Sequence, residues 1–166
     1  MTHPDLDGVL RQEEALMFDG FDENTAFELA GNARKAALAA NAGVGILVKF
    51  WDRPLAFVST PGYAHSNYLW CHRKANTVRL MLRSSYRVLL EQDTPRHLFD
   101  ERWGVSAEEY AISGGAFPII VRGAGIVGAA VVSGLHERDD HDMIVAAISE
   151  TLGRDPAVLA LPPRST

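Results

Sequence analysis

Six histidines are the first residues of this sequence that could serve a chemical site, because neutral imidazole is a common metal ligand. None of them forms the His-Glu-x-x-His pair of a zinc enzyme. His136 and His141 are five residues apart, so on one helix they would point about 140° away from each other. With His136 in a loop and His141 in the first helical turn, the two rings could still converge on a metal or a haem iron. The alternative is that each histidine caps a helix or makes a hydrogen bond.

A second candidate group lies near the start of an expected long helix, where Trp70 precedes Arg73 and Lys74. Two cations oppose the positive end of the helix dipole unless an anion compensates them. An aromatic ring beside two cations suits an aromatic ligand that carries a carboxylate or phosphate, and it also suits an oligomer interface. A solvated surface with one packed tryptophan is the third interpretation. Gly114 and Gly115 precede a strand and can present backbone amides to an anion.

Common catalytic and nucleotide-binding motifs are absent from the sequence. It contains no phosphate-binding GxxxxGK[ST] loop, no GxGxxG fingerprint that opens a helix and no GxSxG elbow. Gly123, Gly125 and Gly128 have a loosely similar spacing, but they fall in an expected hairpin. Cys71 is next to His72, yet adjacent helix residues point about 100° apart, which argues against a nucleophilic Cys-His pair. Cys71 is therefore predicted to be a buried structural residue.

Composition excludes several classes of protein. The 166 residues carry a formal net charge of −5, which argues against general binding to nucleic acid or to anionic membranes, although a local basic patch remains compatible with it. No apolar run reaches the roughly 18 residues of a membrane span, and no secretory leader is visible. One cysteine cannot form an intrachain disulfide, so we expect a cytoplasmic protein.

Helical and strand-like segments follow one another in an order that predicts a single α+β domain with two antiparallel hairpins and five strands. The domain is expected over residues 14–153, between a polar N-terminal arm (1–13) and a flexible proline-rich tail (154–166). The expected strands are 15–18, 44–50, 54–59, 117–122 and 126–133, and the expected helices are 25–41, 66–90, 106–112 and one after Asp139.

The C-terminal half carries a series of short motifs in a fixed order. They are YAISGGAFP at 110–118, GAGIVGAAVV at 123–132, Ser133-Gly134-Leu135 and Asp140-His141, and they follow Trp70-x-x-Arg73-Lys74 and Ser84-Ser85. This order resembles the haem-degrading-domain family, which includes GlcG, HbpS and the PduO C-terminal proteins, and most closely its uncharacterised cytoplasmic branch. The resemblance covers about residues 14–153.

The resemblance implies a profilin-like α/β/α fold with a five-stranded antiparallel sheet, and assembly into homo-oligomers, commonly dimers combined into rings or cages. It implies haem binding by some members, while haem degradation rests on the family's name. The Ser-Gly-Gly that ends this region in the broader family is Ser133-Gly134-Leu135 here. The resemblance assigns no catalytic role to any residue. The candidates for a pocket or an assembly surface are Trp70, Arg73, Lys74, Gly114, Gly115, His136 and His141.

The preferred hypothesis is a cytoplasmic, homo-oligomeric protein that binds haem or a related anionic aromatic ligand. In this hypothesis Arg73 and Lys74 pair with carboxylates, Trp70 stacks on the ring, and His136 or His141 approaches the metal. A structural or adaptor oligomer without a small ligand is the alternative. A haem-degrading enzyme is the third hypothesis.

Overall fold

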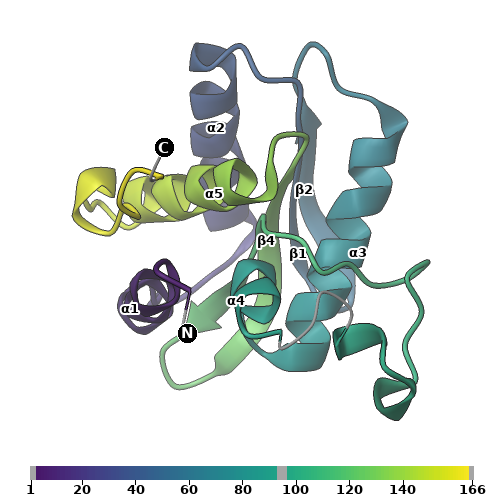
Figure 1. Ribbon diagram of the computed structural model, residues 1–166. Helices are drawn as coiled ribbons and strands as arrows, with labels where there is room; N and C mark the ends of the chain where they lie inside the picture. The colour runs from purple at the N-terminus through teal and green to yellow at the C-terminus, as the bar shows by residue number, and fades with distance from the viewer. Residues whose placement is uncertain (1–2, 93–96, 165–166) are drawn as a thin grey trace.

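The computed structural model describes residues 3–92 and 97–164 and contains a four-stranded antiparallel sheet (Figure 1). The strand order is β2-β1-β4-β3. The bounds are Gly45–Phe50 for β1, Arg53–Ser59 for β2, Ala116–Val121 for β3 and Gly125–Ser133 for β4. Both hairpins expected from the sequence are therefore confirmed, and they meet where β1 pairs with β4.

The fifth strand, expected over Ala15–Phe18, does not form. Ala15 is instead the last residue of α1 (Leu6–Ala15). Within this stretch the backbone of Phe18 pairs with the sheet, through an isolated parallel bridge to Val121 in which the Phe18 amide donates to the Ile120 carbonyl at 2.8 Å. Leu16 and Phe18 are buried in the core, while Ala15 and Met17 are half-buried, so the hydrophobicity of this stretch reflects packing and not strand pairing.

Helices cover both faces of the sheet, which gives the expected α/β/α layering (Figure 1). Side chains alternate along β1, so that Ile46 and Val48 pack in the core under α2 (Glu23–Ala39) and α5 (Glu137–Thr151). Leu47 points to the opposite face, where it packs with buried residues of α3 (His65–Met81). The α3 helix and the body of α5 therefore lie on different faces of the sheet.

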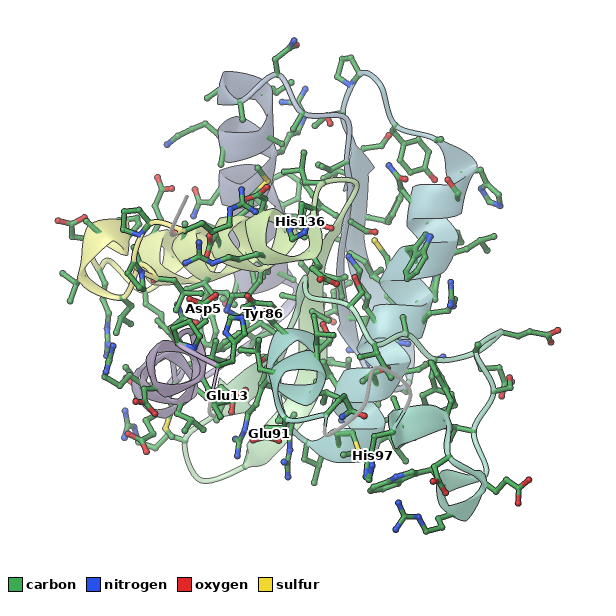
Figure 2. All side chains as sticks on the ribbon, viewed as in Figure 1. Asp5, Glu13, Tyr86, Glu91, His97 and His136 are labelled. Atoms are coloured by element: carbon green, nitrogen blue, oxygen red, sulfur yellow. The ribbon has the colours of Figure 1, made fainter. Side chains whose placement is uncertain are left out.

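The long helix expected over Ser66–Leu90 is broken into two. Leu82 ends α3 in the left-handed conformation, with a φ angle of +53°. The Ser84 side chain then accepts a hydrogen bond from the Arg87 amide and caps α4 (Ser85–Leu90). Arg87 pairs with Glu13 of α1 at 2.7 Å and with Glu91 at 2.6 Å. Figure 2 labels these two glutamates. Because Arg79 lies in α3, Arg83 in the break and Arg87 in α4, the three arginines do not share one helix face.

The segments outside the expected domain also pack against it. Residues 1–13, expected as a polar arm, include most of α1, whose Val9 and Gln12 are buried. The proline-rich segment after residue 154 forms a 3₁₀ turn at Pro156–Val158, and the Gln12 side chain donates to the Leu159 carbonyl at 2.7 Å.

The short helix expected over 106–112 is absent from the described structure, where this stretch forms a turn that follows the 3₁₀ turns His97–Phe99 and Glu101–Trp103. The Ser106 carbonyl accepts from the amides of Glu109 and Tyr110, so the expected capping residues close a turn without propagating a helix. None of the described helices has the length and apolar character needed to span a membrane.

Candidate functional site

Trp70 and Arg73, two of the predicted site residues, line one open cleft on the outer side of α3. The cleft has a volume of about 530 Å³, within the range of small-molecule sites. The Arg73 guanidinium carbon lies 4.2 Å from the centre of the Trp70 ring, in a cation–π contact. The remaining lining comes from α3 and from the loop that crosses it: Ser66, Leu69, His72, Asn76, Ala107, Glu108 and Glu109.

The helix and the loop hold the cleft in shape. Asn76 donates its side-chain amide to the Glu109 carbonyl at 2.7 Å, and Thr77 donates its hydroxyl to the Ala111 carbonyl at 2.8 Å. Trp70 is 39% exposed, so part of its indole remains accessible beside the Arg73 guanidinium that covers the ring. Within the described residues, the Arg73 side chain has no ion pair or hydrogen bond. The cleft thus combines an aromatic ring and an unpaired guanidinium with two glutamates, Glu108 and Glu109, on the opposing loop.

His72 is the only histidine in the lining of this cleft. Its ring packs edge-on against Tyr68, with 4.4 Å between ring centres, and its Nε2 is buried without a hydrogen-bond partner. Partial burial lowers the pKa of His72, and the nearby positive charge of Lys49 lowers it further. The imidazole is therefore neutral at physiological pH, which is the form that binds metals.

Lys74, predicted to face a ligand, is buried and faces the core. Its ammonium group forms a 2.9 Å ion pair with Asp140 Oδ2 on α5, and both side chains are only 2% exposed. Asp140 also accepts from the amides of Gly134 and Leu135. Burial raises the pKa of Asp140, and Lys74 opposes that rise. Lys74 therefore joins two helices and is not available to a carboxylate ligand.

Gly115 makes room for that ion pair, and Gly114 makes room for the backbone of Glu137. Gly115 has a φ angle of +128°, and a Cβ atom there would lie 2.3 Å from the Val132 carbonyl oxygen and 2.8 Å from Lys74 Nζ. A Cβ atom at Gly114 would lie 2.3 Å from the Glu137 carbonyl oxygen. These glycines allow the chain to pass close to α5, and neither lines the cleft beside Trp70.

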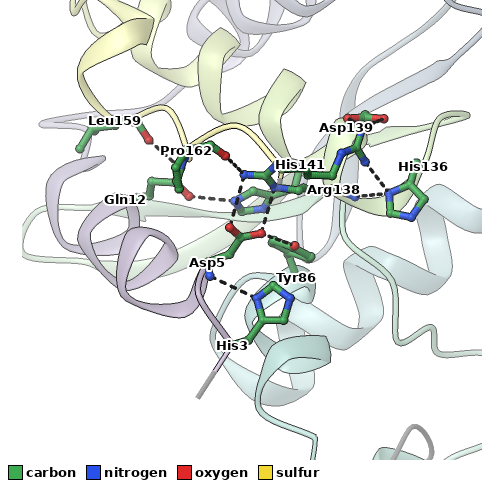
Figure 3. A network of polar contacts seen from close by, with 11 residues as sticks. His3, Asp5, Gln12, Tyr86, His136, Arg138, Asp139, His141, Leu159 and Pro162 are labelled. Carbon is green, nitrogen blue, oxygen red and sulfur yellow. Dashed lines mark hydrogen bonds and ion pairs between the residues drawn. The ribbon is translucent and has the colours of Figure 1, made fainter. Parts of the chain in front are cut away.

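His136 and His141 do not converge (Figure 3). His136 is exposed and caps α5, since its Nδ1 accepts from the Arg138 amide. His141 is fully buried, and its Nε2 lies 2.8 Å from Gln12 Oε1. Because the Gln12 amide nitrogen donates to the Leu159 carbonyl, the Gln12 oxygen faces the ring and His141 Nε2 carries the proton. The two histidines act as a cap and as a core hydrogen-bond donor.

A second polar network lies beside these histidines (Figure 3). The Tyr86 hydroxyl donates to Asp5 Oδ2 at 2.7 Å, and Arg138 Nε lies 2.9 Å from the same oxygen. The same arginine donates through a terminal nitrogen to Asp5 Oδ1 at 3.3 Å. Arg138 also donates to the Pro162 carbonyl. Asp5, Tyr86, Arg138 and His136 line a separate pocket of about 460 Å³, which includes neither Trp70 nor Arg73. The predicted site residues are thus divided among the cleft beside α3, the pocket at His136 and the buried interior.

No group of three or more His, Cys, Asp or Glu side chains in the described parts of the chain is arranged to hold a metal ion. Cys71 is buried, and burial raises the pKa of its thiol to about 12. This agrees with its predicted structural role and leaves it a poor nucleophile at neutral pH.

Comparison with known proteins identifies the family. The family model described as haem degrading protein HbpS-like matches residues 21–149, which is more than half of the chain. The chain belongs to the HbpS-like family. The resemblance seen in the motifs is thereby confirmed.

Two proteins similar to this HbpS-like chain cover at least 90% of it, and two further structures share its fold over a smaller part. A UPF0303 protein of Brucella anthropi is 44% identical over 154 residues, which are 93% of this chain and 91% of the relative. The crystal structure of Ybr137w has a TM-score of 0.81 and 25% identity, and covers 90% of this chain and 89% of its own. HbpS has a TM-score of 0.64 at 18% identity, with 83% of this chain and 94% of its own covered. A structure of PduOC in complex with heme has a TM-score of 0.64 and 16% sequence identity, and the match covers 78% of this chain and 94% of PduOC. The last two likenesses show the fold alone.

The core histidine of this HbpS-like chain should make its stability depend on pH. Burial, assisted by Arg138, lowers the pKa of His141 to about 3. The unfolded chain binds that proton near pH 6.5, so His141 contributes stability that is complete above pH 6.5 and is lost as the pH falls toward 3. Asp142 acts in the opposite direction, because burial raises its pKa to about 6.

The contribution of His141 can be isolated by comparing the wild type with His141→Gln, since both retain Asp142. Between pH 6 and 4, the wild type should lose about 1.4 kcal/mol of unfolding free energy per pH unit more than the variant does. Urea denaturation at a series of pH values measures the two slopes. Parallel curves would show that His141 is not the group that titrates.

Proposed function

We propose that this HbpS-like chain binds a small, planar, anionic aromatic ligand in the cleft beside α3, and that haem belongs to this ligand class. The observation that carries the proposal is the pair of Trp70 and Arg73 in the wall of an open cleft of about 530 Å³. The indole offers a stacking surface, and the unpaired guanidinium can form a charge-assisted bond to a carboxylate.

Family membership and the cleft chemistry both favour a tetrapyrrole. The HbpS-like family is described as haem degrading, and PduOC, which shares the fold, has been crystallised in complex with heme. In the cleft, Trp70 and Leu69 would contact the ring and Arg73 would pair with a propionate. His72, with its neutral imidazole and unpartnered Nε2, is the residue that would serve the iron. Bound haem would supply a redox-active iron, and the chain supplies the ring surface and the cation.

Lys74 does not have the role of a carboxylate partner that the sequence suggested, and neither His136 nor His141 has the suggested role of a metal contact. Lys74 is paired with Asp140 in the core, and His141 is fully buried, so neither is proposed to contact the ligand. His136 lies in the other pocket and is not part of the proposed site.

Haem titration followed at the Soret band tests the proposal. The wild type should show saturable binding of one haem per chain, and Trp70→Ala and Arg73→Gln should each weaken it about tenfold, because stacking contributes about 1 kcal/mol and a charge-assisted hydrogen bond about 1.5–3 kcal/mol. Trp103→Ala and Arg102→Gln are matched controls, since Trp103 is 40% exposed and Arg102 pairs with Asp100 outside the cleft. Equal affinities for all variants, or no saturable signal, would contradict the proposal.

The same α3 surface also favours self-association as a second candidate function. Leu69 is 52% exposed beside Trp70, and Leu80 continues the apolar side chains along the helix. If copies of this chain associate through α3, Trp70→Ala should lower the mass measured by light scattering while Trp103→Ala leaves it unchanged. We place either role in the cytoplasm, in line with the single cysteine.

A further inference from the structure

The α2 helix has one face that is exposed to solvent along its whole length. The opposite face is buried, where Ala26, Leu29 and Ala33 pack in the core with residues of β1 and α5. Figure 1 shows α2 in the outer layer of the fold. We name the exposed residues the outer face of α2, and they are Asn24, Phe27, Glu28, Gly31, Arg34, Lys35 and Leu38. The inference drawn from this face does not depend on the proposed function, because α3 lies on the other side of the sheet.

The outer face of α2 contains two features that the packing of a single chain does not explain. Phe27 is 77% exposed, a value that among the large apolar side chains of the described residues is matched only by Val158. One helical turn later, a Cβ atom at Gly31 would meet nothing within 4 Å, so nothing in this chain requires a glycine there. Glycine inside a helix is destabilising relative to alanine. An exposed phenyl ring beside an open glycine is, however, what a second helix needs in order to approach closely and bury the ring.

The charges of this face are complementary to a second copy of the same face. Glu28 and Lys35 are seven residues apart and lie on one side of it, and Phe27 and Arg34 are seven residues apart and lie on the other side. When two copies of α2 cross antiparallel at Gly31, each Glu28 faces the Lys35 of the partner subunit, and each Phe27 ring faces the partner's Arg34. A parallel arrangement would instead place the cations of one copy against those of the other.

The charged residues of this face are free to make such contacts. Within residues 3–92 and 97–164, Lys35 is the only one of them in an ion pair, and its Nζ lies 2.9 Å from Glu150 Oε1. The two side chains of that pair are 73% and 42% exposed, so the pair contributes little to stability and the lysine can turn to a second carboxylate. A guanidinium over a phenyl ring adds a cation–π contact. The two copies therefore associate without breaking a buried interaction.

We propose that two copies of this chain associate through the outer face of α2, antiparallel and crossing at Gly31. A second copy fits this face better than an unrelated helix does, because the acid and the ring occupy one half of the face and the two cations occupy the other half. A two-fold symmetric contact requires this kind of self-complementary pattern. The face lies on the opposite side of the sheet from the α3 surface, so neither contact excludes the other.

Analytical ultracentrifugation over a concentration series tests the contact. The Trp70→Ala chain, in which association through α3 is weakened, should still reach twice the 18.1 kDa mass of one copy. In that background, Gly31→Met and Phe27→Ala should each raise the dissociation constant about tenfold or more, because the first holds the helices apart and the second removes the buried ring. At a dilution where both are monomeric, thermal unfolding should show that Gly31→Met is at least as stable as its parent, which separates a lost contact from a damaged fold.

Charge reversal tests the antiparallel arrangement. Glu28→Lys alone and Lys35→Glu alone should each weaken the dimer about tenfold, because each places like charges together at two symmetric positions. Mixed in equal amounts, with one variant labelled with nitrogen-15, they should form a heterodimer in native mass spectrometry, since each introduced charge then meets its opposite. Glu101→Lys, a reversal at an exposed position outside the face, and Glu150→Gln, which removes the partner of Lys35 within the chain, are the controls and should leave the dimer unchanged.

A Trp70→Ala chain that keeps the mass of one copy at every concentration would overturn the inference. A dimer that persists unchanged in Gly31→Met, in Phe27→Ala and in both reversals would also overturn it, because the contact would then lie elsewhere. Two reversals that dissociate alone and do not pair when mixed would contradict the antiparallel crossing. The haem experiment fails independently of this one, since the α2 variants should bind haem as the wild type does.

Discussion

Replacing Asp140 with alanine should lower the free energy of unfolding by about 3–5 kcal/mol, because it leaves the buried Lys74 ammonium without its anion. The same change removes the acceptor for the amides of Gly134 and Leu135. Urea denaturation at pH 7 measures the loss. Asp139→Ala is the matched control, since Asp139 pairs with Arg164 at the surface, and it should cost less than about 1 kcal/mol.

A second pair of variants separates the ion pair from general packing. Lys74→Met combined with Asp140→Asn removes both charges and retains an acceptor for one of the amides. This double variant should be more stable than Asp140→Ala. The single change leaves the Lys74 ammonium buried without a counter-charge, whereas the double change leaves no charge buried at this place. If Asp140→Ala unfolds at the same urea concentration as the wild type, the Lys74–Asp140 pair does not stabilise the fold.

Gly115→Ala should destabilise the protein by about 3 kcal/mol or more, since it combines backbone strain with a collision. The new Cβ atom would lie 2.3 Å from the Val132 carbonyl oxygen, which belongs to β4 and cannot move without disturbing the sheet. Thermal unfolding followed by circular dichroism measures the effect.

Gly123→Ala is the control for backbone strain alone. Gly123 also has a positive φ angle, +81°, but a Cβ atom there meets nothing within 4 Å. Its cost should be about 1 kcal/mol. Equal losses of stability in the two alanine variants would mean that the collision with the Val132 carbonyl does not contribute to the cost of Gly115→Ala.

The elements that the sequence predicts correctly are those with a strong local signal. Each hairpin combines two apolar strands with a short polar or glycine-rich turn, and both are present in the structure. The break at Leu82 was missed because Val78 and Leu82 continue a helical spacing, while the cap at Ser84 competes with it. At Phe18 an apolar residue is compatible with an isolated bridge as well as with a strand, so the sequence alone does not distinguish the two.

The candidate site was predicted in part, for physical reasons that differ between residues. Trp70 and Arg73 are one helical turn apart, so their contact follows from local geometry. Lys74 lies on the same helical face as the buried residues Cys71 and Val78, and this spacing was the available signal that it faces the core. The contact between His141 and Gln12 spans 129 positions of the chain, and no local pattern specifies it.

The Lys74–Asp140 pair also has a consequence for how homologous sequences can diverge. Because a change at either position leaves one buried charge without its partner, most single substitutions at positions 74 and 140 give a destabilised protein. Lineages should therefore keep both charges or exchange both, so that positions 74 and 140 vary together. Position 115 should remain glycine wherever the lysine is retained, since its missing side chain is the space that the ammonium group occupies.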